Sequence, residues 1–190
     1  MKPHHQFPRT SRWLHWTMAV MILAMLFIGV GMVASVSEYD NLVSIHKPLG
    51  MIILVLAAVR LLNRIFNPAP PLPVTLARWQ RTAAYLSHLV LYVLMFALPL
   101  VGWAMLSAAA FPVKLYNSIY LSPILPHSVS LYATLRQIHS LLAYLLFAVV
   151  LVHIAAAIMH LLIYRDGVFD SMAPWRIGKK HATRNQAKIN

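Results

Sequence analysis

The sequence predicts an all-α integral membrane protein built as a four-helix bundle. Of its 190 residues, 60% are hydrophobic and only 11% are charged, and its mean hydropathy of +0.68 exceeds that of most soluble domains. Four apolar stretches are each long enough to cross about 30 Å of hydrocarbon as a helix. We place these spans at residues 13–35, 46–66, 83–106 and 138–163, within one transmembrane domain of residues 1–176 that precedes a basic cytoplasmic tail, residues 177–190.

Tryptophan and proline mark the ends of these spans. Trp13 opens the first span, where an amphipathic ring suits the headgroup level of the membrane. The second span stops at the sequence NPAPPLP, residues 67–73, because prolines lack the amide hydrogen that a helix interior requires. The third span ends near Ser107, and residues 107–137 form an unusually long loop before the fourth span begins.

Basic residues predict the orientation of the spans. Thirteen lysines and arginines lie on the side of the two termini and the proline-rich connector, whereas Lys47, Lys114 and Arg136 lie on the other side. By the positive-inside rule, both termini are cytoplasmic and the loops at 36–45 and 107–137 are outside, which is the periplasm for a bacterial inner membrane. The same distribution accounts for the formal charge of +12, so no nucleic-acid partner is expected.

Two histidines of the fourth span indicate the chemistry. His139 and His153 are fourteen residues apart, just short of four helical turns, so both rings project from one face at levels about 21 Å apart. Ionisable side chains inside a span are costly and usually functional. Because the chain has no cysteine, thiolate-bound metals and iron–sulfur clusters are excluded, and histidine is the obvious metal ligand.

The order of the spans supplies each of these histidines with a partner. His46, at the outer start of the second span, is expected to meet His139, and His15, near the inner start of the first, is expected to meet His153. Two imidazoles on opposing helices, separated by a flat macrocycle, bind haem iron at both axial positions. The chain lacks the Cys-x-x-Cys-His motif of covalent attachment. The expected cofactors are therefore two haem b groups with bis-histidine ligation.

Several segments together resemble the bacterial cytochrome b561 family. They are LHW at 14–16, IHKPLG at 45–50, SHLVLYVLMFALPLVGW at 87–103, and the spaced His139 and His153. The resemblance covers residues from about 9 to 176. It implies a four-helix, di-haem membrane bundle related to the cytochrome b subunits of nickel-iron hydrogenases. It also implies the same four haem ligands that the depth of the spans selects, namely His15, His46, His139 and His153.

The resemblance implies a function as well. The family includes stand-alone members that exchange electrons with quinone, and superoxide oxidases that oxidise superoxide on the outer side and pass the electron through haem to ubiquinone. The expected function is therefore transmembrane electron transfer coupled to the quinone pool, with superoxide:ubiquinone oxidoreductase as the specific activity. His160, two turns beyond His153, matches a family histidine associated with quinone and is a quinone-side candidate.

Three further residues each have two interpretations. His88, in a motif that the family shares, is either a cross-helix hydrogen-bonding residue or a second quinone-side candidate. Lys47 and Arg136 lie near the outer histidines in the sequence. They are expected either to attract superoxide toward the outer haem or to pair with haem propionates.

Two other functions fit the same four spans. As the membrane anchor of a dehydrogenase or hydrogenase complex, the chain would accept electrons from a redox partner protein and have no activity alone. As a small transporter, it would use its histidines to carry protons or a metal ion across the membrane. Broken helices or inverted repeats would favour a transporter, and the sequence shows neither clearly.

Overall fold

The four-helix prediction is confirmed by a computed structural model, which describes residues 6–71, 76–116 and 119–173. The expected tail at 177–190 lies outside these ranges. The long helices are α1 (Arg9–Ala34), α2 (Tyr39–Phe66), α3 (Arg78–Ala108) and α4 (Val129–Met159). A π-helical turn, η1 (His160–Tyr164), extends α4 and is followed by a short helix, α5 (Val168–Met172). Strands β1 (Val113–Tyr116) and β2 (Ile119–Leu121) lie between α3 and α4.

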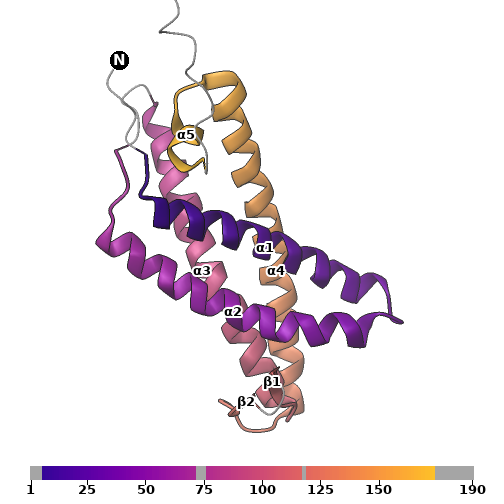
Figure 1. The fold of residues 1–190 in the computed structure, drawn as a ribbon. Helices are drawn as coiled ribbons and strands as arrows, with labels where there is room; N and C mark the ends of the chain where they lie inside the picture. The colour runs from indigo at the N-terminus through magenta and orange to yellow at the C-terminus, as the bar shows by residue number, and fades with distance from the viewer. Residues whose placement is uncertain (1–5, 72–75, 117–118, 174–190) are drawn as a thin grey trace, which may run out of the picture.

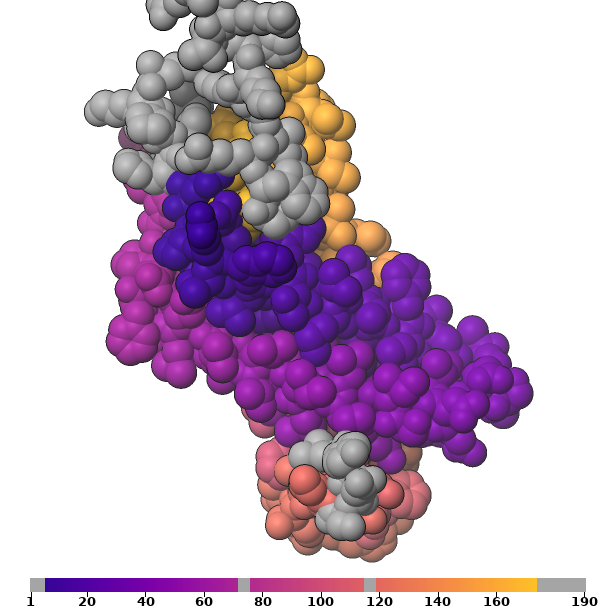
Figure 2. All heavy atoms as spheres, in the orientation of Figure 1, coloured from indigo at the N-terminus to yellow at the C-terminus, as the bar shows by residue number. Residues whose placement is uncertain are grey.

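The long helices form two pairs. α1 packs along α2 and α3 packs along α4, and Figure 1 shows the first pair crossing the second obliquely. α2 also packs on α3 and so joins the two pairs. The molecule has α5 at one end and the β1–β2 hairpin at the other, and we call these the α5 end and the hairpin end (Figure 1). In Figure 2, the α1–α2 pair forms a band that projects beyond the α3–α4 column.

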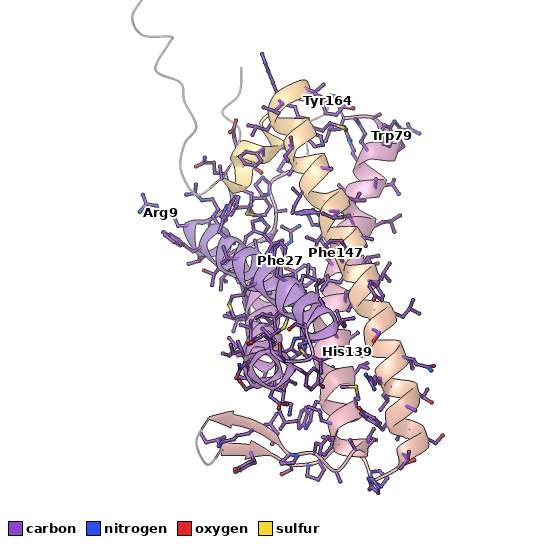
Figure 3. The ribbon with its side chains drawn as sticks, turned by 90° about the vertical axis from the view of Figure 1, so that its right-hand side faces the viewer. Arg9, Phe27, Trp79, His139, Phe147 and Tyr164 are labelled. Carbon is purple, nitrogen blue, oxygen red and sulfur yellow. The ribbon has the colours of Figure 1, made fainter. Side chains whose placement is uncertain are left out.

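Apolar side chains point outward over most of the helical surface. Phe27 is 73% exposed and Phe66 is 78% exposed, and many leucine, isoleucine and valine side chains share this position. A helix that is apolar on all sides is typical of a membrane span, because hydrocarbon rather than water surrounds it. Figure 3 shows Trp79 and Tyr164 together at the α5 end, where amphipathic aromatic rings suit a membrane interface.

The buried core is small and lies where α1, α2 and α3 meet. Its centre is Met18, Ala57 and Met95, against which Ile22, Leu56, Tyr92 and Phe96 pack. Along α3 this core lies between His88 and Gly102, and along α2 it lies between His46 and Arg60. The core therefore separates the histidines of the hairpin end from those of the α5 end.

All four long helices begin before the spans predicted from the sequence, and α2 and α4 do so by the most residues. α2 begins at Tyr39 rather than at residue 46, and α4 begins at Val129 rather than at residue 138. The added turns are more polar than the spans, so a search for apolar runs misses them. At the start of α4 the Ser128 hydroxyl accepts a hydrogen bond from the Leu131 amide at 3.3 Å, which caps the helix.

The expected loop at 107–137 is consequently shorter than predicted and contains the β1–β2 hairpin. The strands are antiparallel, with Val113 opposite Leu121, and the sequence analysis did not predict them because they are too short to show alternation. The indole of Trp103 donates to the carbonyl of Ser122 at 3.1 Å, and the Ser107 hydroxyl accepts from the Ile124 amide at 3.1 Å. These bonds attach the loop to the end of α3.

The chain reverses at the α5 end and covers the start of α1. The reversal passes through η1 and through Arg165, whose φ of 49° lies in the left-handed region. The indole of Trp16 then donates to the Met172 carbonyl, and the Arg12 guanidinium donates to the Ala173 carbonyl, both at 3.0 Å. The segment that includes α5 is therefore fixed beside the turn of α1 that carries His15.

Candidate functional site

The structure brings the four predicted ligands together in the expected pairs. His15 of α1 faces His153 of α4, and their ring centroids are 6.4 Å apart. His46 of α2 faces His139 of α4, and their ring centroids are 6.2 Å apart. The two rings of each pair are steeply inclined, at 74° and 67° respectively. Two imidazole pairs of nearly the same geometry thus lie about four turns apart along α4.

These separations match two imidazoles bound on opposite sides of one metal ion. A ring nitrogen lies about 2.0 Å from a bound metal and the ring centroid lies roughly 1.1 Å behind it, so the two centroids are expected about 6.2 Å apart. Edge-to-face contact between aromatic rings also permits separations of this order, at about 4.5–7 Å. The packing of the helices and the surroundings of the rings therefore have to distinguish the two arrangements.

The helices that carry each pair are held apart. α4 packs extensively on α3 but makes little backbone contact with α1 or α2, the helices that carry its histidines' partners. The buried Nδ1 atoms of His15 and His46 also lack a hydrogen-bond partner among the described residues. Buried polar atoms are normally satisfied, so an unsatisfied imidazole indicates that another group completes the site. A flat macrocycle between α4 and the α1–α2 pair fits both observations.

A glycine makes room for one of the four rings. A Cβ atom built on Gly102 of α3 would lie 3.2 Å from Cε1 and 3.5 Å from Nδ1 of His139. The His139 imidazole therefore rests against bare backbone of α3, and Figure 3 shows the position of His139 along α4. Any larger residue at 102 would push the ring away from α3.

A third histidine joins the pair at the α5 end. The ring of His88, on α3, has its centroid 5.8 Å from that of His153. His88 also lines a cavity whose other walls are Phe7, Ser11, Arg60, Asn63, Arg64, Tyr92 and Met172. The structure thus places His88 next to the predicted ligand pair, whereas the sequence alone left its role open.

Two arginines of this cavity were not recognised as site residues from the sequence. Arg60 and Arg64 lie one turn apart on α2, with the guanidinium of Arg60 6.0 Å from the ring centroid of Tyr92 and that of Arg64 5.4 Å from the ring centroid of Phe7. Arg60 also lies close enough to act electrostatically on all three histidines of this end. The available signal was the pair of cations at helical spacing, which the positive-inside rule already explains.

His160, the predicted quinone-side residue, has a partner that the sequence did not indicate. Its Nδ1 lies 2.7 Å from Oδ2 of Asp166, and both side chains are largely buried, at 17% and 10% exposure. The other carboxylate oxygen of Asp166 accepts a hydrogen bond from the Val168 amide at 3.1 Å. The ring of Tyr164 lies 5.2 Å from that of His160. The reversal at the α5 end therefore builds a fixed histidine–carboxylate pair.

The two predicted cations of the opposite end lie near the His46–His139 pair along the chain. Lys47 follows His46 on α2 and is half-buried. Arg136 lies about one turn before His139 on α4 and is exposed. They come from different helices, and both are closer in sequence to this pair than to the pair at the α5 end.

The comparison with known proteins identifies the family. The model of the prokaryotic cytochrome b561 family matches residues 6–175, which is most of the chain. The chain belongs to the prokaryotic cytochrome b561 family. The predicted resemblance is thus confirmed, and it covers the four long helices and the hairpin between them.

Three curated relatives agree with this assignment. Cytochrome b561 homolog 2 of Escherichia coli (strain K12) is 32% identical over 108 residues, which are 54% of this chain and 56% of that protein. The probable superoxide oxidase CybB of Yersinia pestis is 28% identical over 180 residues, 92% of this chain and 99% of that protein. Cytochrome b561 homolog 1 of Escherichia coli (strain K12) is 28% identical over 187 residues, 90% of this chain and 99% of that protein.

The family and the fold together define the protein's general role. Cytochromes b561 carry b-type haem, and this chain has four helices able to span a membrane. It is therefore a bacterial multi-pass membrane cytochrome with a role in electron transfer. The paired imidazoles and the separation between α4 and the α1–α2 pair would suit such a group, because histidine is a usual ligand of haem iron.

Proposed function

We propose that this cytochrome b561 is a di-haem superoxide:ubiquinone oxidoreductase of the bacterial inner membrane, with both termini in the cytoplasm. His46 and His139 hold one haem b toward the hairpin end, and His15 and His153 hold the other toward the α5 end. The observation that carries this proposal is the pair of ring separations, 6.2 and 6.4 Å, between helices that otherwise make little contact.

The ligand set favours electron transfer over oxygen activation. Haem supplies reversible one-electron chemistry when it is bound. Each haem would be held by two imidazoles, those of His46 and His139 or those of His15 and His153, which would leave no open position on the metal for a substrate. α4 holds both pairs at levels about 21 Å apart, so the two centres lie at different depths of the membrane.

The hairpin end is proposed to receive the electron from superoxide. Superoxide is a small anion, and Lys47 and Arg136 place positive charge on the two helices that carry His46 and His139. Positive charge near a site raises the association rate of an anion. The likeness to a probable superoxide oxidase over nearly the whole chain supports this choice of donor.

The α5 end is proposed to reduce ubiquinone. Two superoxide ions release two electrons and become oxygen, and one quinone takes up those electrons with two protons to form the quinol. The Asp166 carboxylate accepts the Nδ1 hydrogen of His160, which leaves Nε2 to hydrogen-bond a quinone carbonyl or to transfer a proton. The buried His160–Asp166 pair supports this assignment because it fixes the ring at the end of α4.

Absorbance spectra of the purified protein test the cofactor directly. Oxidised and dithionite-reduced spectra, with haem quantified per chain, should show two b-type haems with the spectrum of low-spin, six-coordinate iron. A chain that purifies fully folded and without haem would contradict the proposal.

Single substitutions test the pairing. His46→Ala and His139→Ala should remove one haem, and His15→Ala and His153→Ala should remove the other. Loss of the same haem in all four variants would reject the two pairs. His88→Ala should keep both haems. If it instead removes the α5-end haem while His15→Ala retains it, His88 is the ligand.

Rapid mixing with superoxide tests the donor. The haems should become reduced, and ubiquinone should then reoxidise them. The rate of reduction should fall as ionic strength rises, because salt screens the attraction between superoxide and the cations of the hairpin end. Haems that remain oxidised with superoxide yet accept electrons from a partner enzyme would favour the membrane-anchor function instead.

A further inference from the structure

The cavity at the α5 end concentrates positive charge. Arg60 and Arg64 both line it, and their guanidinium groups lie near the rings of Tyr92 and Phe7 at 6.0 and 5.4 Å. Both arginines are only partly exposed. A guanidinium has five N–H donors, so a group that lies over an aromatic ring can still bind an anion. Two such guanidinium groups border one cavity.

This charge has no carboxylate partner among the described residues. The whole chain has four acidic residues, and the one ion pair found in the described part of the chain joins Asp166 to His160. Glu38 and Asp40 lie at the start of α2, whereas Arg60 and Arg64 lie near its end. Asp170 lies on α5 and forms no ion pair with either arginine among the described residues. Charged groups that are withdrawn from water are normally paired. The anion that matches these arginines is therefore expected to come with a ligand.

We propose that Arg60 and Arg64 bind the two propionate carboxylates of the haem at the α5 end. This inference rests on the proposed function, which places that haem between His15 and His153. The cavity adjoins the same site, because His88 lines it and has its ring 5.8 Å from that of His153.

The chemistry favours a carboxylate ligand over a quinone in this cavity. Guanidinium and carboxylate groups form bidentate, charge-assisted hydrogen bonds, which are about twice as strong as neutral ones. A quinone headgroup is neutral and needs a hydrogen-bond donor but not two cations. Asn63, between the arginines in sequence, donates to the Ser11 hydroxyl at 2.7 Å and so fixes α2 against α1 at this point. The two arginines therefore extend from a braced segment of α2.

Redox titration of the intact holoprotein tests whether the positive charges of Arg60 and Arg64 lie near the α5-end haem. Arg60→Gln and Arg64→Gln should each lower the midpoint potential of the α5-end haem, because a nearby cation stabilises the reduced form, which carries one positive charge fewer. The other haem should keep its potential. Arg9→Gln is the matched control, because it removes the same charge from an exposed position on α1 that does not line the cavity.

Esterified haem tests the carboxylates themselves. The full-length protein is loaded with haem b or with its dimethyl ester, and binding at the α5-end site is measured in a His139→Ala background that lacks the other haem. The unmodified protein should prefer haem b by roughly ten- to a hundredfold, as expected for hydrogen bonds to charged groups. The Arg60→Gln/Arg64→Gln double variant should lose this preference and bind both forms equally.

Three results would overturn the inference. One is an equal preference for haem b in the unmodified protein and the double variant. The second is a change in both midpoint potentials that Arg9→Gln reproduces. The third is unchanged haem properties with weaker binding of ubiquinone, which would assign the cavity to the quinone. A protein that binds no haem would instead refute the proposed function, so the two failures are distinguishable.

Discussion

Replacing Gly102 with alanine should weaken the haem site proposed at His139, because α3 accommodates that imidazole only where it lacks a side chain. The added Cβ would lie 3.2 Å from Cε1 of His139. Carbon atoms in contact prefer about 3.5–4.0 Å, so the ring has to shift by a few tenths of an ångström. Metal–ligand distances tolerate deviations of only about 0.2 Å, so this displacement is large enough to disturb axial ligation.

The size of the effect follows from the cost of overpacking. Forcing extra atoms into a filled site costs about 1–3 kcal/mol, which corresponds to a five- to 150-fold loss of haem affinity at roughly 1.4 kcal/mol per factor of ten. Alanine also stabilises a helix by about 1 kcal/mol relative to glycine. A measurement of folding stability alone would therefore hide part of the cost of overpacking against His139. Gly29→Ala is the matched control, because a Cβ there meets no atom within 4 Å.

Transfer of haem to an excess of apomyoglobin, followed by absorbance, measures the affinity of each site. In Gly102→Ala, one of the two haems should leave faster and its low-spin electron paramagnetic resonance signal should shift. In Gly29→Ala, both haems should behave as in the unmodified protein. Equal retention of haem in the two variants would show that Gly102 does not set the position of His139, and the reasoning from ring contact would be wrong.

Three further predictions concern the two ends of the molecule. Asp166→Asn should slow ubiquinone reduction at the α5 end by about tenfold while both haem spectra stay unchanged, because His160 loses the carboxylate that fixes its ring. Asp166→Glu should rescue the rate in part, and equal slowing of haem reduction by superoxide would argue against a proton-linked role. Lys47→Gln should lower the rate of haem reduction by superoxide severalfold at low salt and make that rate less dependent on ionic strength. An unchanged dependence on ionic strength would show that Lys47 is not part of the donor site. Trp16→Phe deletes the hydrogen bond to the Met172 carbonyl and should cost about 1 kcal/mol of local stability. Proteolysis near α5 should then be faster, and cleavage at the rate of the unmodified protein would refute this prediction.

The histidine pairs were accessible to sequence reasoning because helical geometry and span order determine them. A spacing of fourteen residues puts His139 and His153 on one face of any helix, and alternating span directions bring His46 and His15 to matching levels. The exact helix ends were not needed for this step. α2 starts earlier than predicted, yet His46 still faces His139 because the two helices run through the same level.

The contacts at the α5 end depended on features that a linear pattern does not carry. Asp166 meets His160 only because a π-helical turn and the left-handed conformation of Arg165 reverse the chain between them. Arg60 was explained in the sequence by membrane orientation, which is a sufficient reason for a basic residue near the end of a span. Its place on a cavity wall requires the packing of α1, α3 and α5 around the end of α2.

Because one continuous helix carries a histidine of each pair, α4 sets the distance between the two proposed haem sites. Each residue inserted between His139 and His153 would increase their spacing along the helix by about 1.5 Å and turn His153 about the helix axis by about 100°. One added residue would therefore rotate the ring away from His15, whereas seven would return it to within about 20° of its face and move it by roughly 10 Å. The distance between the centres can thus change during evolution only in steps of whole turns, with matching changes in α1, and cannot be adjusted gradually.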